Sequence, residues 1–474
     1  MIGPCEAQSF TYLNISPIDN IGVDIIQLQD SSYILLNVQI ANNFSHVSSS
    51  IIALDKFGNY LYTKQLADTT LLWLFTNQIV SDGLGNFYAV GSTTMDTSLY
   101  RYTNVWFAKF DTNFDTVWTK QYHTSDTAEL CNNMVYLNGH FYLAGAYYYK
   151  LNNGGQTGPL PLLYDIDSQG NLIKTFYEDT FGLISSIGFD SYNNLLMGAD
   201  IYYPYFQLYK YTLNSGLAVL DTCYISETGN NNYQINLGQN KNASVFDGIN
   251  NSFTHTQTKI QIIDEQCQNT FKLDFGNPNE DSRCAYFGAI DTISKNRIIV
   301  GGTANFIYGT SLYMPVQSQF HCAVFDDSLN VIWESHAGDD AYHVMMRAKP
   351  TLDGGVVCVG YRYDYLNNFP TENRDPIVMK FDSLGNIQGS YDNNNQYQSM
   401  FNVYPNPASD ILNIEALDNL EYDYEVYNIT GDRLMQGELK SHTKINILKF
   451  SSGVYYLKIV SKKGSSFKKF LVTH

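Results

Sequence analysis

The sequence predicts an all-β protein, a seven-bladed β-propeller followed by a small immunoglobulin-like β-sandwich. Three observations predict it. The 474 residues include 38 Tyr and 27 Phe, which favour strands, and 34 Gly with many Asn and Ser, which favour turns. Two short motifs alternate along residues 20–391. The last 74 residues change to closely spaced short strands.

The first motif is an apolar strand, an Asp-x-x-x-Asn turn and a second strand. The intervals from Asp55 to Asp111, from Asp111 to Asp167 and from Asp326 to Asp382 are each 56 residues. Five copies are clear, at 50–66, 106–122, 161–176, 321–336 and 376–391. The gap between the third and fourth leaves room for two degenerate copies, near 206–220 and 259–273. The count is therefore seven.

The second motif is a polar tight turn, often Asp-Gly, followed by an apolar strand that often ends in Gly. It occurs at 28–38, 81–92, 136–146, 189–200, 292–303 and 351–361, with a degenerate copy at 245–255. Together the motifs make a unit of four antiparallel strands and about 55 residues, which is typical of a propeller blade. A β-solenoid is the alternative, although solenoid repeats are shorter. We expect residues 10–15 to complete the blade that contains 376–381 and so close the ring.

The units resemble propeller repeats of many secreted bacterial proteins, which carry a D-G-G-[YF] turn and a K-[LF]-D-x-x-G-N-x-x-W turn. In a four-stranded meander A-B-C-D, the B–C and D–A loops emerge on one face. The predicted B–C loops are long and rich in Tyr, and the D–A loops carry His and acids such as Glu178 and Asp179. We therefore expect a loop face that combines aromatic and acidic side chains.

Tyrosine offers rigid apolar area and a hydroxyl, so this face is interpreted as a recognition surface for a protein or glycan ligand. The alternative is that these tyrosines pack loop against loop. The candidate binding residues are Tyr100, Tyr102, Tyr147, Tyr148, Tyr149, Tyr202, Tyr203, Tyr205, Tyr361, Tyr363, Tyr365, His336, Asp339, Asp340 and His343.

The sequence contains no G-x-S-x-G, H-E-x-x-H, Walker A or zinc-spaced Cys/His pattern. The stretch 335–343 holds two His and two Asp, which could bind a metal or form an acid/base pair, but its position is that of an ordinary D–A loop. The stretch 165–171 starts like a calcium loop and lacks the closing Glu. No catalytic residue, metal or cofactor is assigned.

Charge limits the partners. Residues 401–474 hold 9 Lys+Arg and 8 Asp+Glu, so residues 1–400 hold 28 − 9 = 19 positive and 46 − 8 = 38 negative charges. An acidic body repels phosphate backbones, so nucleic acid is not expected as a partner.

No apolar run approaches the length of a transmembrane segment. Residues 1–8 are interpreted as the remnant of a signal region or a disordered start.

Seven Cys are too few for a disulfide scaffold in a chain of this length. Cys322 and Cys358 lie in apolar strands and are expected to be buried. Cys223, Cys267 and Cys284 lie in polar sequence. If the protein is exported, one disulfide among these three is expected, with the pairing left open.

A second domain is predicted at 401–474, after a propeller at 9–391 and an Asn/Gln-rich linker at 392–400. Its short strands suit a small β-sandwich. Three segments (402–414, 426–439 and 445–460) and the basic final strand resemble the type A C-terminal sorting domain of type IX secretion cargo. The matching positions are Pro405, Asn406, Pro407, Gly431, Gly453 and Tyr455. Phe450 departs from the pattern, which has Leu there.

This resemblance implies a bacterium of the Bacteroidota, Sec export and passage across the outer membrane, with the secretion machinery as the partner of residues 401–474. The preferred function is a secreted or cell-surface binding module for an extracellular protein or glycan. One alternative is a secreted propeller enzyme acting on extracellular polymers, which would require two or three carboxylates or His at the channel mouth. The other is a structural or adhesive surface component.

Overall fold

The structure is a computed structural model in which the chain forms two compact units, Met1–Phe10 with Ser16–Gln388 and Thr11–Ile15 with Gly389–His474. The two units are described separately. The structure describes residues 9–41, 46–66, 73–94, 103–123, 127–149, 157–202, 207–225, 229–238, 241–249, 255–264, 267–294, 296–307, 316–338, 340–368, 373–387, 401–416, 422–428, 433–440, 442–461 and 464–473. The predicted start at 1–8 and the predicted linker at 392–400 lie outside these ranges, so both stay predictions.

The first unit is built almost entirely of short antiparallel strands. The strands of its first four meanders are β2 (Asp19–Gln27), β3 (Tyr33–Ala41), β4 (His46–Leu54), β5 (Tyr60–Gln65), β6 (Trp73–Ser81), β7 (Phe87–Thr94), β8 (Asn104–Phe110), β9 (Thr116–Tyr122), β10 (Thr127–Leu137), β11 (His140–Tyr149), β12 (Leu160–Asp167), β13 (Leu172–Tyr177), β14 (Gly182–Phe189), β15 (Leu195–Ile201), β16 (Gln207–Leu213) and β17 (Val219–Tyr224). Each meander makes four strands in sequence order.

Three further meanders follow, with one short helix. Their elements are β18 (Gly229–Gly238), β19 (Lys241–Ile249), β20 (Thr256–Ile263), β21 (Asn269–Phe275), β22 (Ser282–Cys284), β23 (Ile290–Ser294), β24 (Arg297–Ala304), β25 (Gln319–Phe325), β26 (Val331–Ala337), β27 (Tyr342–Pro350), β28 (Val356–Tyr363), α1 (Tyr365–Asn368) and β29 (Arg374–Phe381). In the sixth, β22 and β23 both pair with β24, so the first strand is in two pieces.

The described strands therefore form seven blades. Blades 1 and 2 are joined into one sheet by a single parallel pair, Val47 with Trp73. The last blade has the order β1-β29-β28-β27, in which β1 (Phe10–Leu13) is the outer strand. This confirms the predicted closure, in which the N-terminal strand completes the blade that contains 376–381.

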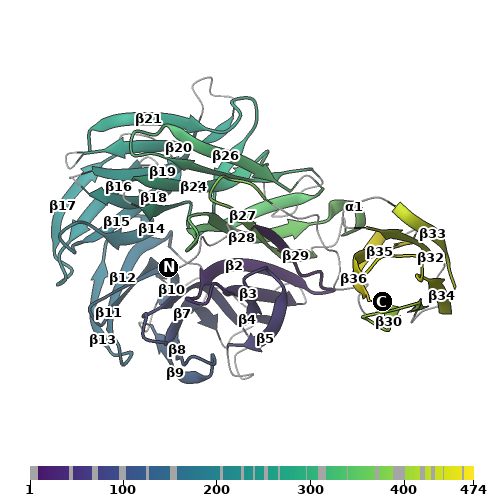
Figure 1. Ribbon diagram of the computed structural model, residues 1–474. Helices are drawn as coiled ribbons and strands as arrows, with labels where there is room; N and C mark the ends of the chain where they lie inside the picture. The colour runs from purple at the N-terminus through teal and green to yellow at the C-terminus, as the bar shows by residue number, and fades with distance from the viewer. Residues whose placement is uncertain are drawn as a thin grey trace, which may run out of the picture. The chain divides into compact units, whose positions relative to one another are not determined.

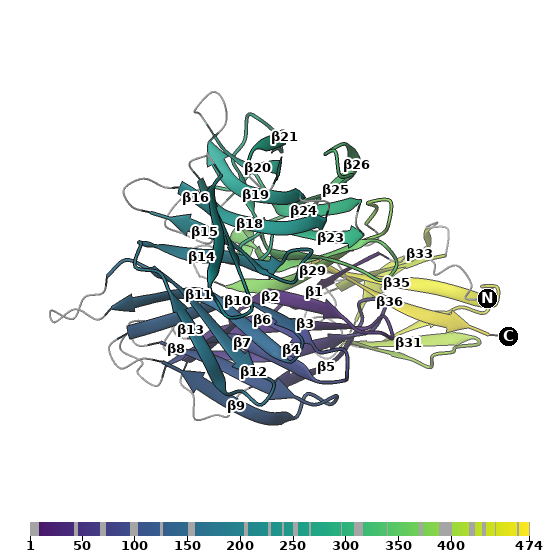
Figure 2. The ribbon, with the colours of Figure 1, turned by 90° about the vertical axis from the view of Figure 1, so that its left-hand side faces the viewer.

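The first strands of the blades, such as β2, β10, β14, β18 and β27, gather toward the middle of the first unit (Figure 1). The last strands, such as β9, β21 and β26, lie at its periphery in both views (Figures 1 and 2). The apolar core lies between neighbouring blades. For example, Phe107 of blade 2 and Phe141 of blade 3 have ring centroids 5.2 Å apart. This arrangement is that of a β-propeller.

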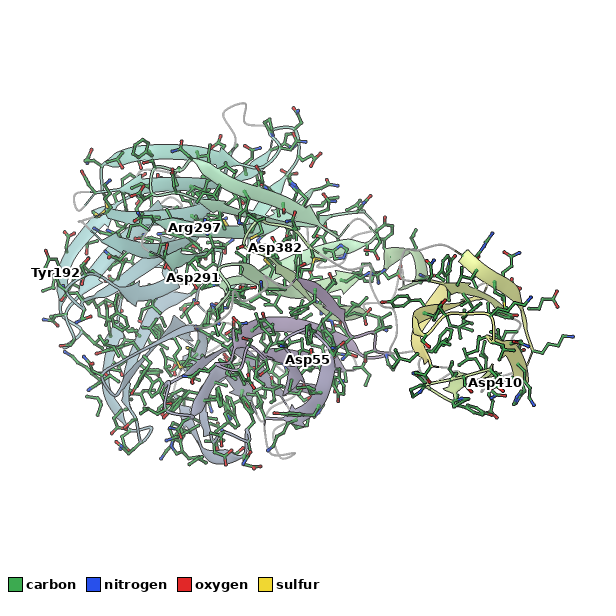
Figure 3. All side chains as sticks on the ribbon, in the orientation of Figure 1. Asp55, Tyr192, Asp291, Arg297, Asp382 and Asp410 are labelled. Carbon is green, nitrogen blue, oxygen red and sulfur yellow. A yellow bond between two sulfur atoms is a disulfide. The ribbon has the colours of Figure 1, made fainter. Side chains whose placement is uncertain are left out.

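The repeated Asp closes the C–D turns by hydrogen bonding. Asp55 Oδ1 accepts the backbone N–H groups of Phe57 and Asn59, and Oδ2 accepts the Asn59 amide at 2.8 Å. Asp167 and Asp382 hold their own turns in the same way; Figure 3 labels Asp55 and Asp382. The Asp167 carboxylate accepts hydrogen bonds within its own turn. Residues 165–171 therefore form an ordinary turn, although their sequence starts like a calcium loop.

The two degenerate C–D turns are also closed by a side-chain oxygen that accepts backbone N–H groups. Asn214 replaces Asp in blade 4 and accepts the N–H groups of Gly216 and Ala218. Asp264 in blade 5 accepts the N–H of Gln268 at 2.7 Å. The predicted A–B turn at 245–255 is wrong, because residues up to Ile249 belong to β19, where buried Asp247 accepts the N–H of Cys284 at 2.6 Å.

The first strands of the blades carry a register shift, and polar side chains bridge neighbouring blades there. In blade 2 the shift lies between Thr76 and Gln78, and the Asn77 amide donates to the Cys131 carbonyl of blade 3 at 2.7 Å. The Asn133 amide of blade 3 donates to the Ser185 carbonyl of blade 4 at 2.8 Å. A bulge exposes backbone groups that the ladder leaves unpaired, and these buried side chains satisfy them.

Cys223 and Cys267 form a disulfide across 44 residues, which links β17 of blade 4 to the C–D turn of blade 5. The expectation of one disulfide among three cysteines is confirmed, and Cys284, Cys322 and Cys358 are free and buried. The double variant Cys223→Ala/Cys267→Ala is expected to lower the free energy of unfolding by about 4 kcal/mol at 25 °C, because a loop of that length restricts the unfolded chain by about this amount.

The measurement is urea unfolding of the oxidised wild type, the reduced wild type and the double variant. Reduction should lower the wild type to the level of the variant and leave the variant unchanged. Equal stability of all three would contradict a structural disulfide at this position.

The second unit is a seven-stranded sandwich within the described residues. One sheet has the order β30-β31-β34 and the other β33-β32-β35-β36. The strands are β30 (Phe401–Tyr404), β31 (Ile411–Ala416), β32 (Tyr422–Tyr427), β33 (Arg433–Leu439), β34 (His442–Asn446), β35 (Gly453–Ser461) and β36 (Gly464–Val472). Leu412, Ile414 and Ile445 from one sheet pack with Val426 and Leu457 from the other. This confirms the predicted small β-sandwich.

Candidate functional site

The structure places the predicted loop-face residues in several different environments. Five lie outside the described residues: Tyr100, Tyr102, Tyr203, Tyr205 and Asp339. Tyr148, Tyr202 and Tyr365 are half-buried. Tyr149 is exposed, and so is Asp340, which accepts a hydrogen bond from Arg362 Nε at 2.9 Å.

Four predicted contact residues are buried, so they cannot serve as surface contacts. Tyr361 and Tyr363 belong to β28, and Tyr147 belongs to β11, since both strands extend farther than the sequence pattern indicates. Tyr361 and Tyr363 pack in the core cluster that also contains Phe306. His343 is buried on β27, where Nδ1 lies 3.0 Å from the Ser318 carbonyl. These four act in packing.

His336 is also not in a loop. It lies on β26, the last strand of blade 6, and its ring stacks on that of His321 with centroids 4.1 Å apart. Burial lowers the pKa of His321, and the hydrogen bond from His321 lowers the pKa of Glu334. The predicted grouping of His336 with Asp340 and His343 is therefore replaced by a grouping with His321 and Glu334.

An exposed aromatic group lies at the loop end of blade 3. We call Tyr149, Tyr177 and Phe181 the blade-3 aromatic patch; their exposed fractions are 46%, 41% and 40%. The buried Tyr147 ring lies at the base, in edge contact with Tyr149 at 5.4 Å and with Tyr177 at 5.0 Å between centroids. This base fixes the positions of both exposed rings.

The backbone brings Phe181 into the same group. Tyr149 N–H donates to Thr157 Oγ1 at 2.9 Å, so the strand carrying Tyr149 lies beside residues 157–158. A side chain at Gly158 would meet the Phe181 ring at 2.9 Å, so only Gly allows this approach. The Tyr202 N–H donates to the Phe181 carbonyl at 2.7 Å, which brings the half-buried Tyr202 to the patch.

Two carboxylates lie next to the patch. Glu178 and Asp179 follow Tyr177 directly in the loop between β13 and β14, and Asp179 Oδ1 accepts the Tyr147 hydroxyl at 3.4 Å. Of the three patch residues, only Tyr149 was among the predicted binding residues, and the two acids were predicted in the D–A loop beside it. Tyr177, the last residue of β13, and Phe181, in the loop after it, were not predicted, although both stand within four residues of the acids in the sequence.

A polar cavity of about 300 Å³ lies among the first strands of blades 2 to 7. Its charged lining residues are Asp291, which is labelled in Figure 3, Arg347 and Lys349. Burial raises the pKa of the Asp291 carboxyl and lowers that of Lys349. The sequence could not show which side chains point toward the axis.

Asp24 of β2 is held by these cations. Its carboxylate lies 2.6 Å from Lys349 Nζ and 3.2 Å from Arg347 Nε, and it accepts the N–H of Ile79 at 2.9 Å. Asp291 is the one carboxylate among the described residues that line the cavity. The enzyme alternative requires two or three carboxylates or His at the channel mouth, and the described lining of this cavity supplies one carboxylate.

Among the described sorting residues, Asn406, Gly453 and Tyr455 lie next to β36 of the second unit. Pro405, Asn406 and Pro407 are exposed, and Asn406 Oδ1 accepts the N–H of Leu471 at 2.8 Å. Both X–Pro bonds of this segment are cis. The Tyr455 hydroxyl donates to the Ser451 carbonyl at 2.8 Å. Gly453 is exposed, and Gly431 lies outside the described residues.

Phe450, which stands where the sorting pattern has Leu, packs into this same region. Its ring stacks on Tyr455 with centroids 4.9 Å apart. Residues 402–473 match the family described as "Secretion system C-terminal sorting domain". The last domain is a type IX secretion sorting domain. The sorting domain implies a Bacteroidota protein that is exported to the cell surface or the extracellular space, and it implies contact with the secretion machinery.

Solved structures similar to the chain include propellers of unrelated sequence. One is the Neurospora crassa Pan2 WD40 domain, with 10% identity, coverage of 81% of this chain and 96% of that one, and a TM-score of 0.44. Another is the β-propeller domain of the Trilobed protease from Pyrococcus furiosus, with 12% identity, coverage of 80% and 100%, and a TM-score of 0.41.

Chaetomium thermophilum Raptor is also similar, at 10% identity and a TM-score of 0.49; the match covers 81% of this chain and 30% of Raptor. No curated protein matches the chain. Among the residues that the structure describes, no helix is long and apolar enough to cross a membrane.

Proposed function

We propose that the propeller is a binding module at the cell surface or in the medium, and that it binds a neutral glycan through the blade-3 aromatic patch. The observation that carries this is the patch itself. Three aromatic rings are exposed, two of them (Tyr149 and Tyr177) contact the buried Tyr147 ring, and Glu178 and Asp179 lie beside them. Loops on a rigid scaffold are where binding residues concentrate.

The chemistry of the patch favours a glycan over a protein. Aromatic rings offer apolar faces that suit the C–H faces of sugars, and carboxylates accept hydrogen bonds from hydroxyl groups. The formal net charge of the chain is −18, which disfavours acidic polysaccharides. The rings are already positioned in the free protein, so little conformational entropy is lost on binding.

The test is a glycan array with the full chain, followed by affinity measurement on the best glycan. Tyr149→Ala/Tyr177→Ala should weaken binding at least tenfold, because aromatic anchors at a binding centre contribute about 2 kcal/mol or more when truncated. Tyr192→Ala is the matched control. Tyr192 is 71% exposed in an A–B turn of blade 4, at the opposite end of the blades, and should have no effect.

Three results would count against the proposal. The first is the absence of any neutral glycan that binds. The second is a double variant Tyr149→Ala/Tyr177→Ala that binds the glycan as tightly as the control Tyr192→Ala does. The third is capture of a surface protein that depends on Tyr149 and Tyr177, which would keep the patch as a binding site and replace the glycan with a protein ligand.

A further inference from the structure

Three metal-ligating side chains meet on the last two strands of blade 6. His321 lies on β25, and Glu334 and His336 lie on β26. One possible ligand atom of each lies within 4.8 Å of those of the other two. None of the three residues belongs to the blade-3 aromatic patch or to the described lining of the axial cavity.

The sheet register explains why the three side chains share one face. His321 is the direct cross-strand partner of His336, and Glu334 is the partner of Ala323. Residues two apart on a strand point to the same side. Glu334 is therefore the diagonal neighbour of His321, and the spacing is fixed by the backbone.

His321 is held in place before any ligand arrives. Its side chain is 1% exposed, and its ring lies between Phe275, at 3.7 Å between centroids, and His336, at 4.1 Å. Its Nε2 donates to Glu334 Oε1 at 2.6 Å. Glu334 and His336 are exposed, so an ion can reach the group from solvent.

We propose that His321, Glu334 and His336 form a binding site for a divalent transition-metal ion such as Zn²⁺. Two imidazoles and one carboxylate are a ligand set that zinc takes in proteins, with water in the fourth position. The ion would take the place of the proton on His321 Nε2, and the neutral ring would then carry that proton on Nδ1, so no proton has to leave the ring.

Binding requires the His336 ring, which now lies within 12° of parallel to that of His321, to turn until one of its nitrogens points at the ion. Zinc bonds of about 2.0–2.2 Å place tetrahedral donor atoms roughly 3.4 Å apart. The buried ring can stay fixed while the two exposed side chains close on it. The bound ion would join β26, which is the edge strand of its sheet, to β25 beyond their backbone ladder. An edge strand has a neighbouring strand on one side only.

The test uses the full chain without a histidine tag. Isothermal titration with Zn²⁺ should show one saturable site. His336→Ala and Glu334→Gln, both changes at exposed positions, should each weaken it at least tenfold. Co²⁺ should bind the wild type with visible d–d absorption and lose that spectrum in His336→Ala. Ca²⁺, which prefers oxygen ligands, should not compete.

The control variant is His123→Ala, since His123 is exposed and lies outside the group. It should bind Zn²⁺ as the wild type does. The proposal is overturned if the wild type takes up no Zn²⁺ in a saturable way, or if the wild type and both site variants bind it equally. Circular dichroism checks that the variants are folded, so that a lost site is distinguished from a lost structure.

Discussion

A chain that ends at residue 400 is expected to stay inside the cell, with almost complete loss of protein from the surface and medium. The reason is that residues 402–473 are the type IX sorting domain, and the contact with the export machinery depends on it. The measurement is an immunoblot of periplasm, outer membrane and medium from a Bacteroidota strain, with the same Sec leader on the full and the shortened chain.

The sandwich has its own buried core, so its loss should not unfold the propeller. All four Trp of the chain, at 73, 106, 118 and 333, belong to the propeller. Unchanged Trp fluorescence in the shortened chain therefore serves as the folding control. A reciprocal experiment attaches residues 401–474 to a reporter with a Sec leader, which should carry the reporter outside. Export of the shortened chain at the level of the full one would refute the assignment.

Much of the architecture could be predicted because each blade repeats the same turn chemistry. Asp55 and Asp382 stand at the same place in blades 1 and 7, and both accept hydrogen bonds from the two following turn positions. A turn that depends on one side chain leaves a signal in the sequence. The Asn214 side chain accepts the same two backbone hydrogen bonds as Asp does in the other turns, and the blade that carries it still forms.

The surface of the loop face could be predicted only in part. Tyr147 and Tyr149 are two residues apart, and both were expected at the surface; Tyr147 is buried and Tyr149 is exposed. Because side chains alternate between the two faces of a strand, the sequence shows that Tyr147 and Tyr149 share a face. Which of the two is buried depends on the neighbouring ring of Tyr177 and on where β11 ends. Whether Asp291 and Lys349 point toward the axis depends on bulges and on strand tilt, and neither feature leaves a recognisable motif in the sequence.

The contact between the first and last blades gives the second large prediction. Arg374 of β29 donates to Asp19 of β2 through Nε at 2.8 Å and through a terminal nitrogen at 2.6 Å, and its backbone N–H donates to the same carboxylate at 2.9 Å. The Arg374 side chain is 2% exposed. Its guanidinium also lies 5.2 Å from the centre of the Tyr361 ring.

Asp19→Ala is expected to lower the free energy of unfolding of the propeller by about 3–5 kcal/mol, because it leaves the buried guanidinium without its partner. Urea unfolding followed by Trp fluorescence measures this in the full chain, since all the Trp report on the propeller. Lys64 and Asp115 provide the matched control. They join blades 1 and 2 at 2.6 Å, with side chains 32% and 66% exposed, so Lys64→Ala should cost about 0–1 kcal/mol.

A double variant separates the two possible origins of the effect. If the cost of Asp19→Ala comes from an unpaired buried charge, Asp19→Leu/Arg374→Met should recover most of the lost stability, since apolar residues of similar size can replace a buried ion pair. If the bidentate contact is itself what holds the first blade to the last, the double variant should be as unstable as Asp19→Ala. An Asp19→Ala propeller no less stable than Lys64→Ala would show that the Arg374–Asp19 pair does not measurably stabilise the contact between the first and last blades.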